Sequence, residues 1–249
     1  MVIGAGGLGC RWARGAHSRV SSESDLMLVD ADMESFKGAS YAHCMHLDPT
    51  GTEKGIAALP ALAAHRTISA LDEIDQVLTN AELVVILTGL GGGTGTGSTI
   101  ELARASRQRG AIVVVVAGLP FAEQSFRSRM ANDALPSLED AADICIRVSL
   151  ERLAWQSRRR RLNWQQGSGW IEELVEGLIS TIGKLGKINL DLMDLKSIVK
   201  HKGGATLIVA SGPLEDTRKI VEDARRSPLI DIGLDGAKGH STLRILWRI

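Results

Sequence analysis

The sequence predicts an α/β fold built on a doubly wound, Rossmann-like and mostly parallel sheet. Runs of β-branched, apolar residues occur at 83–87, 112–116 and 143–148. Such runs are apolar on both faces, as expected of strands in the centre of a parallel sheet. Segments with helical spacing separate the runs, and glycine-rich turns follow two of the predicted strands. Strands that alternate with helices in this way form open α/β sheets.

Composition sets broad limits on function. The 249 residues are enough for one large domain, or for one domain and a smaller companion, and the formal net charge is zero. A neutral chain has no general attraction to nucleic acid or acidic membranes. Three widely spaced cysteines fit reduced intracellular thiols, and we find no signal peptide and no membrane-spanning apolar run. We expect a cytoplasmic protein with no nucleic-acid partner, which would meet a membrane only indirectly.

The N-terminal segment is predicted to bind phosphate. A short strand leads into Gly4-Ala5-Gly6-Gly7-Leu8-Gly9, a GxGxxG pattern, and residues 10–20 have helical spacing. Glycine lets the backbone approach a ligand closely, and a helix N-terminus attracts anions. A tight turn that packs a strand against a helix would produce the same pattern.

A second predicted strand, at 27–30, ends in acidic residues. Asp30 closes this strand and Asp32 lies close behind it. In a dinucleotide-binding fold an acid at this point binds a ribose hydroxyl, although an ordinary strand-end turn is the alternative. Residues 38–55 read as a loop that contains His43, Cys44 and His46. No second ligand cluster accompanies these three residues, so we predict no metal site.

The most distinctive stretch is Gly91-Gly92-Gly93-Thr94-Gly95-Thr96-Gly97-Ser98, directly behind the strand at 83–87. Its bare N–H groups and the helix predicted from Thr99 to about Arg109 make a cradle for negative charge, most naturally phosphate. Two threonines and a serine would add hydroxyl donors. Further helices are predicted at 68–78 and at 124–138.

The last third of the chain contains a basic run and two further motifs. Residues 158–161 are four consecutive arginines between Trp155 and Trp164. This run could contact nucleic acid, nucleotide or acidic lipid, but we favour a solvated helix face or loop. Residues 170–182 follow the pattern of an amphipathic helix. Strands are expected at 206–210 and 242–246, around a helix at 216–226.

After the amphipathic helix comes Asn189-Leu190-Asp191-Leu192-Met193-Asp194. Its two carboxylates are three positions apart at a transition from loop to helix, so both can face one way. Asp194 is also explained by a helix first turn, where acids are favoured.

Taken together, these motifs resemble the tubulin/FtsZ superfamily of filament-forming GTPases. The stretch 91–97 is the family's phosphate loop without a mismatch, and 189–194 matches its NxDxxD loop. Pro120-Phe121, Ser227-Pro228-Leu229 and Gly236-Ala237-Lys238-Gly239 look like FtsZ rather than eukaryotic tubulin. The similarity extends over essentially the whole chain.

The resemblance implies a GTP-binding domain at 1–164, a central helix at 165–185 and a shortened α+β second domain at 186–249. It also implies GTP or GDP as ligand, with Mg²⁺ possible, and head-to-tail filaments in which a neighbour inserts its acids over the γ-phosphate. Asn189, Asp191 and Asp194 would be the catalytic residues acting in trans. The implied nucleotide-binding residues are Gly6, Gly7, Cys10, Asp30, Asp32, Ala57, Gly91, Gly92, Gly93, Thr94, Gly95, Thr96, Glu123, Gln124, Arg127 and Leu150.

The chain also departs from the family pattern. Of the γ-phosphate-sensing loop, only the first glycine and the proline remain in 55–60, and Asp30-Ala31-Asp32 replaces the usual Asn-Thr-Asp. Leu150-Glu151-Arg152 replaces Asn-Asp-Arg near the guanine, which removes an amide that could bind the base. The sequence therefore predicts phosphate binding more firmly than guanine specificity. The short second domain would leave apolar surface for a protein partner to cover.

Three functions compete at this stage. The first is a divergent FtsZ-like GTPase, cytoskeletal or related to cell division, that hydrolyses GTP on assembly. The second is a nucleotide-binding scaffold with little turnover, which the altered sensing loop favours. The third is a nicotinamide-dependent oxidoreductase, which leaves the second glycine stretch unexplained.

Overall fold

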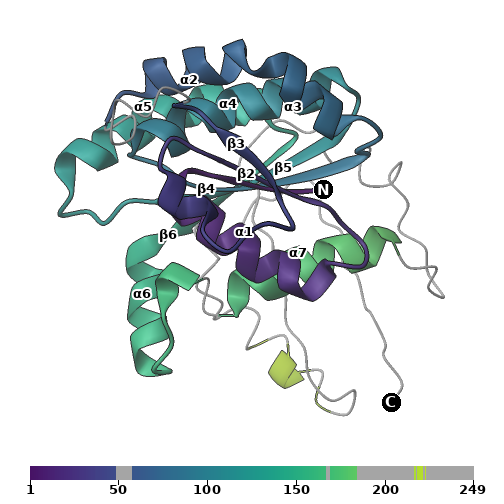
Figure 1. The fold of residues 1–249 in the computed structure, drawn as a ribbon. Coiled ribbons are helices and arrows are strands. Elements are labelled where there is room, and N and C mark those ends of the chain that lie inside the picture. Colours follow the sequence, from purple (N-terminus) through teal and green to yellow (C-terminus); the bar gives the residue numbers. More distant parts are fainter. Residues whose placement is uncertain (49–57, 167–168, 184–215, 217, 221, 223–249) are drawn as a thin grey trace.

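The computed structural model describes residues 1–48, 58–166, 169–183, 216, 218–220 and 222 (Figure 1). A sheet of six strands, paired in parallel throughout, forms its centre in the order β3-β2-β1-β4-β5-β6. The strands are β1 Val2–Ala5, β2 Leu26–Asp30, β3 His43–His46, β4 Leu83–Gly89, β5 Ile112–Leu119 and β6 Ile144–Ser149. This is the strand order of a doubly wound Rossmann-type sheet, so the predicted fold class is confirmed.

Helices cover both faces of the sheet. The α-helices are α1 Gly6–Val20, α2 Pro60–Ser69, α3 Leu71–Leu78, α4 Gly93–Gln108, α5 Ser125–Ala141, α6 Leu150–Arg159 and α7 Trp170–Gly183, and short 3₁₀ turns are η1 Met33–Phe36 and η2 Trp164–Gln166. Helices α2 to α5 lie on one face, and α1 and α7 lie on the other (Figure 1). Each face has its own apolar core, because side chains alternate between the two faces along β1, β4 and β5.

The predicted central strands are present because their sequences are apolar on both faces. Every residue from 83 to 87 and from 112 to 116 is buried, and β4 and β5 pair along seven residues. Small residues let the helices come close to these strands. Gly9, Ala13 and Ala16 of α1 are buried, and a Cβ on Gly9 would overlap the carbonyl oxygen of Leu87 in β4.

Three local predictions were wrong. Residues 38–55 read as a loop, but 43–46 form the edge strand β3, which pairs with β2 and buries Met45. The helix expected at 68–78 is two helices, because α2 begins at Pro60 and the chain turns at Ala70 before α3. Proline suits the first turn of a helix, where its missing N–H costs no hydrogen bond.

The third correction concerns the glycine stretch. The helix was expected to begin at Thr99, but α4 begins at Gly93, so Thr94 to Ser98 are already helical. By contrast, α7 covers the amphipathic helix predicted at 170–182. Nearly all of the predicted second domain, 186–249, lies outside the described residues.

Candidate phosphate-binding site

The two glycine turns meet where the strand order reverses. β1 and β4 are neighbours in the middle of the sheet, and α1 leaves β1 on one face while α4 leaves β4 on the other (Figure 1). In open α/β sheets this switch point leaves a crevice at the carboxyl ends of the strands, where ligands bind. Both helix N-termini therefore open toward the same crevice.

The two turns are in backbone contact. Gly6 opens α1 with a positive φ of +71°, and a Cβ on it would lie 2.9 Å from the backbone nitrogen of Gly95. Only glycine adopts this conformation at little cost and also leaves room for the second turn. The N-terminal ends of two helices, and their unpaired N–H groups, are thus brought to one place.

The remaining glycines of the two turns fall into two groups. A Cβ on Gly95 would overlap the carbonyl oxygen of Gly89, and one on Gly97 would overlap that of Pro60. These glycines allow α4 to pack closely on β4 and α2. Gly92 has no atom within 4 Å of its Cβ position, and the nearest atoms to that of Gly7 are 3.7 Å away. Gly92 therefore borders open space, whereas a Cβ on Gly7 would make only ordinary contacts with neighbouring side chains, and these two glycines are the ones best placed to admit a ligand.

The hydroxyl groups of the second turn are turned into the protein. Thr96 Oγ1 accepts a hydrogen bond from the Gly91 N–H at 2.9 Å, and Thr96 is 1% exposed. Ser98 is fully buried, and its Oγ has no partner among the described residues. Thr94 is 8% exposed and lies close enough to Asp30 to lower the pKa of its carboxyl, which burial raises more strongly. The contact of these hydroxyls with a ligand stays a prediction, and the backbone N–H groups of the turn are the other donors available to it.

Asp30, at the end of β2, accepts a hydrogen bond on each of its two carboxylate oxygens. Its carboxylate accepts from the Ala31 N–H at 2.8 Å and from Ser35 Oγ at 2.5 Å. Burial nevertheless raises the pKa of Asp30 above its usual value. Asp30 Oδ2 lies 3.8 Å from the Cβ position of Gly7, so a buried acid borders the proposed cradle.

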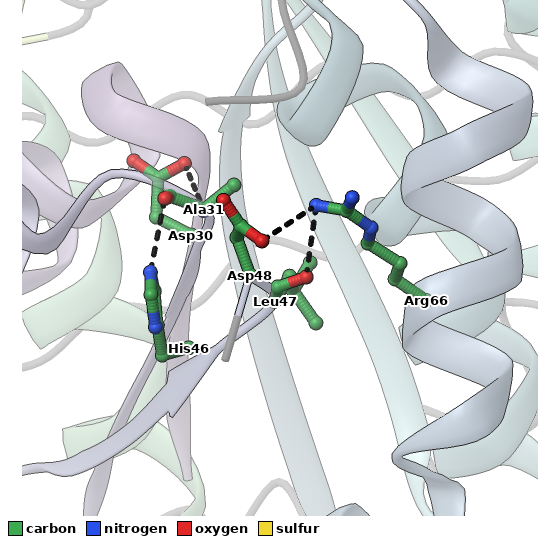
Figure 2. A network of polar contacts seen from close by, with 6 residues as sticks. All are labelled: Asp30, Ala31, His46, Leu47, Asp48 and Arg66. Carbon is green, nitrogen blue, oxygen red and sulfur yellow. Dashed lines mark hydrogen bonds and ion pairs between the residues drawn. The ribbon is translucent and has the colours of Figure 1, made fainter. Parts of the chain in front are cut away.

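A polar network links this acid to the far edge of the sheet (Figure 2). His46 of β3 bonds through Nε2 to the carbonyl oxygen of Ala31 at 3.0 Å. Two residues further on, Asp48 forms an ion pair of 3.6 Å with Arg66, which also donates to the Leu47 carbonyl oxygen. Asp48 is 1% exposed. Arg66 belongs to α2, so the pair joins the end of β3 to the next described helix.

The first turn of α5 lies beside the glycine turn. A Cβ on Gly91 would be 2.8 Å from both the Cβ and the carbonyl oxygen of Arg127, and Gly91 has a positive φ of +88°. Arg127 is exposed, as are Glu123 and Gln124, which precede α5. The structure thus brings Arg127 to the cradle. The ribose contacts of Glu123 and Gln124 stay predictions.

Two of the predicted nucleotide-binding side chains belong to the core. Cys10 is 1% exposed and its thiol lies 3.5 Å from the Gly4 carbonyl oxygen, while burial raises the pKa of this thiol. Leu150 is 6% exposed and packs over Gly118 beside Trp12. Either residue would reach a ligand only through its backbone.

Of the other predicted residues, one caps a 3₁₀ turn and the rest lie outside the described residues. Asp32 is exposed, and its Oδ1 accepts from the Glu34 N–H at 3.0 Å, so it caps η1. Ala57, Asn189, Asp191 and Asp194 lie outside the described residues, so their contributions remain predictions.

Sequence reasoning missed several residues that build the site. Thr88 Oγ1 lies 2.9 Å from the carbonyl oxygen of Gly95 and 3.3 Å from that of Ala5, and it thereby ties the start of α4 to β1. Arg11 Nη1 and Ser35 Oγ lie 3.7 and 3.8 Å from the Cβ position of Gly7. Thr88 could have been found in the sequence as the polar residue that continues an otherwise apolar strand into the glycine turn.

The described residues hold neither a metal cluster nor a membrane-spanning helix. No group of three metal-ligating side chains occurs among them, and His43, Cys44 and His46 do not form one. Across the same residues, no helix is long and apolar enough to cross a membrane. The arrangement that stands out is two adjoining helix N-termini with glycine backbone at Gly7 and Gly92 and two arginines nearby. Such an arrangement binds the phosphates of a nucleotide.

The chain is similar to proteins of known family. The family model described as "Tubulin/FtsZ family, GTPase domain" matches residues 1–156. Cell division protein FtsZ of Haloferax mediterranei is 29% identical over 242 residues, which cover 95% of this chain and 64% of that protein. FtsZ 2 of Haloferax volcanii is 29% identical over 245 residues, covering 96% and 61%. The chain therefore spans about three fifths of the length of these relatives.

Solved structures give the same picture. The empty FtsZ dimer of M. jannaschii is similar with a TM-score of 0.80 and 26% identity, over 95% of this chain and 70% of that one.

Proposed function

Because this chain belongs to the tubulin/FtsZ family through its GTPase domain, we propose that it binds GTP at the switch-point crevice and hydrolyses it at head-to-tail contacts between subunits. The observation that carries the proposal is the contact between the turns of Gly6 and Gly95. This contact brings two helix N-termini side by side. Their N–H groups together form a site long enough for a nucleotide's chain of phosphates.

Individual residues have distinct roles in this proposal. The backbone at Gly7 lies along the α- and β-phosphates, and the backbone from Gly91 to Gly93 lies along the β- and γ-phosphates. Arg127 and Arg11 offset phosphate charge from the rim. If Mg²⁺ accompanies the nucleotide, it neutralises further phosphate charge when bound. Guanine recognition has less support than phosphate binding, because Leu150 packs in the core and offers no amide to a base.

The hydrolytic step is assigned to a neighbouring subunit. In the proposal, Asn189, Asp191 and Asp194 of one subunit approach the nucleotide of the next and hold the attacking water in place. A carboxylate would repel the γ-phosphate if it served only to bind it, so ordering and polarising water is the more suitable task. A monomer has only half of each site, and hydrolysis therefore requires assembly. The solved FtsZ dimer supports self-association of this kind. We place the protein in the cytoplasm, as a cytoskeletal or division-related FtsZ paralogue.

Phosphate release, measured with GTP and with ATP over a series of protein concentrations, tests the proposal. Specific activity should rise with concentration and disappear in Asp191→Ala and Asp194→Ala. Asp72→Ala, which removes an exposed acid from the first turn of α3, is the matched control and should keep full activity. Turnover that does not change with concentration or with these variants would overturn hydrolysis in trans. The nucleotide that copurifies with the protein, identified by chromatography, gives the base preference.

A mixing experiment isolates the shared site. Gly92→Ala should weaken the nucleotide half and Asp194→Ala should remove the hydrolytic half, so each variant alone should release little phosphate at nucleotide concentrations well below the weakened Kd. Mixed, they can form a contact with both halves intact, and activity should partly return. A mixture no more active than either variant would count against a site shared between subunits.

The second candidate is a scaffold that binds nucleotide without turnover. The altered residues at 55–60 favour it, because a sensing loop that no longer reads the γ-phosphate would leave GTP and GDP forms alike. Equal affinity for GTP and GDP, together with no phosphate release, would support this candidate over the first.

A further inference from the structure

The end of helix α6 carries a dense patch of positive charge that nucleotide binding does not use. Residues Arg158, Arg159, Arg160 and Arg161 are consecutive and all exposed. Within the described part of the chain, none of their four guanidinium groups forms an ion pair with a carboxylate. By contrast, two exposed arginines of similar setting, Arg104 and Arg109, are paired with Glu101 and Asp75. The chain as a whole is neutral, so the charge of this patch is local.

Two of the four arginines are held in place by tryptophans. The guanidinium carbon of Arg159 lies 4.8 Å from the ring centre of Trp155, and that of Arg160 lies 4.7 Å from the ring centre of Trp170. Cation–π stacking of this kind fixes the side chains while leaving their N–H donors available. The other two, Arg158 and Arg161, line a surface hollow of about 470 Å³ together with Ala154, Leu162, Asn163 and Trp164.

The backbone at the end of α6 places Arg161 at a position that normally favours glycine. Arg161 has a φ of +57°, and the Leu162 N–H bonds to the Ser157 carbonyl oxygen at 2.9 Å, which is a Schellman-type helix end. An arginine there is strained where glycine would not be. A role for its side chain at the surface would account for this choice.

Apolar side chains lie among the arginines. Trp155 is 56% exposed and Leu162 is 46% exposed. Trp155 follows Arg152 by three positions and precedes Arg159 by four, so the three share the outer face of α6. Helix α6 follows the edge strand β6 and projects from one side of the molecule, where a flat surface can reach it (Figure 1).

We propose that the 158–161 patch, with Trp155 and Leu162, binds the surface of membranes rich in acidic phospholipid. Arginines attract the anionic headgroups, and an exposed tryptophan and leucine beside them enter the boundary between headgroups and acyl chains. The observations favour lipid over single-stranded nucleic acid. Arg159 covers one face of Trp155, and Trp170 is 9% exposed under Arg160, so these rings are poor platforms for stacked bases. This proposal departs from the sequence-based expectation of a solvated face and of purely indirect membrane contact. It is independent of GTP hydrolysis.

Cosedimentation with vesicles tests the proposal on the full chain. Vesicles of equal parts phosphatidylcholine and phosphatidylserine should bind the protein, and vesicles of phosphatidylcholine alone should not. Each arginine near an acidic surface contributes about fivefold to partitioning, so Arg158→Ala with Arg161→Ala should weaken binding about 25-fold. The control Arg104→Ala with Arg109→Ala removes the same charge from α4 and its C-terminus, and it should bind as the wild type does. Equal binding by both double variants, or equal binding to both vesicles, would overturn the proposal.

Two further measurements separate lipid binding from a purely structural role of Arg161 and from binding to DNA. Arg161→Gly should raise the melting temperature, because it relieves the left-handed strain, and yet bind acidic vesicles less well. A variant that is more stable with unchanged vesicle binding would show that Arg161 has no part in the surface. Duplex and single-stranded DNA of matched charge are the competitors. Protein that binds either DNA, but not the acidic vesicles, would assign the patch to nucleic acid and overturn the membrane proposal.

Discussion

Gly6 and Gly95 touch through their backbones, with 2.9 Å between the Cβ position of the first and the nitrogen of the second. The first residue opens α1 and the second lies in the first turn of α4, so two glycine motifs from distant parts of the sequence form one surface. A side chain on Gly6 would push the two helix N-termini apart, and one on Gly95 would overlap the Gly89 carbonyl oxygen and push α4 away from β4. Both motifs are therefore needed to form the phosphate-binding surface.

Two alanine substitutions in the same turn should have opposite effects. At Gly92 a Cβ enters open space, so Gly92→Ala should keep its stability and lose at least about tenfold in nucleotide affinity, equivalent to about 1.4 kcal/mol. At Gly97 a Cβ would overlap the Pro60 carbonyl oxygen, so Gly97→Ala should lower the free energy of unfolding by about 1–3 kcal/mol. Urea unfolding and titration with a fluorescent nucleotide measure the two effects. A stable Gly92→Ala protein with wild-type affinity would disprove our placement of the ligand.

Asp30 should weaken nucleotide binding through its charge. Because burial raises the pKa of this carboxyl, it takes up a proton at higher pH than an ordinary aspartate. Affinity should then rise as the pH falls through that raised pKa, since the neutral acid no longer repels phosphate. Asp30→Asn should bind nucleotide more tightly by about 1 kcal/mol at neutral pH and lose this pH dependence. Weaker binding by Asp30→Asn would instead indicate that the carboxylate contacts the ribose.

Glu172 of α7 should destabilise the fold at neutral pH. It is 8% exposed, its Oε2 has no hydrogen-bond partner among the described residues, and burial raises its pKa above 4.5. An acid whose pKa is higher in the folded state favours folding when protonated. Stability is therefore lost as the pH rises from about 4.5 through the folded-state pKa. Glu172→Gln should raise the free energy of unfolding at pH 7 by on the order of 1 kcal/mol. The neighbouring Glu173→Gln is the control and should change little in thermal unfolding.

The ion pair between Asp48 and Arg66 should matter more than the surface pairs. Asp48 is almost fully buried, so Asp48→Asn should cost about 1–3 kcal/mol in chemical unfolding. The matched change Asp75→Asn breaks a pair with Arg109 whose side chains are 33% and 43% exposed. That change should cost less than about 1 kcal/mol. Equal costs would mean that Arg66 finds a new partner when the carboxylate is removed.

The central strands could be predicted because each is identified by its own amino-acid sequence. Residues 83–87 and 112–116 are apolar on both faces, and only a covered parallel strand tolerates that pattern. The edge strand at 43–46 carries no such signal. Two of its four residues are exposed histidine and cysteine, and its pairing with β2 decides its conformation. Local sequence is a weak guide where a neighbouring strand supplies the hydrogen bonds.

The site was predictable in outline, and the function of each glycine was not. The spacing in 91–97 identifies a place for phosphate, but the role of Gly97 depends on Pro60, far away in the sequence. In the same way, the sequence does not reveal that the Thr96 hydroxyl accepts a hydrogen bond from the Gly91 N–H, as it does in the structure. Arg127 reaches the cradle because α5 folds back over Gly91. Such contacts follow from tertiary packing, which spacing along the chain does not encode.

The position of β1 between β2 and β4 has a consequence for synthesis on the ribosome. β1 and β2 emerge early, but the second partner of β1 begins only at Leu83. Until then β1, which is apolar on both faces, presents an open edge that another nascent chain could pair with. The strand that carries the first glycine turn is therefore also a site where the growing chain is open to aggregation until β4 is made. Conditions that slow translation before residue 83 should lower the yield of soluble protein.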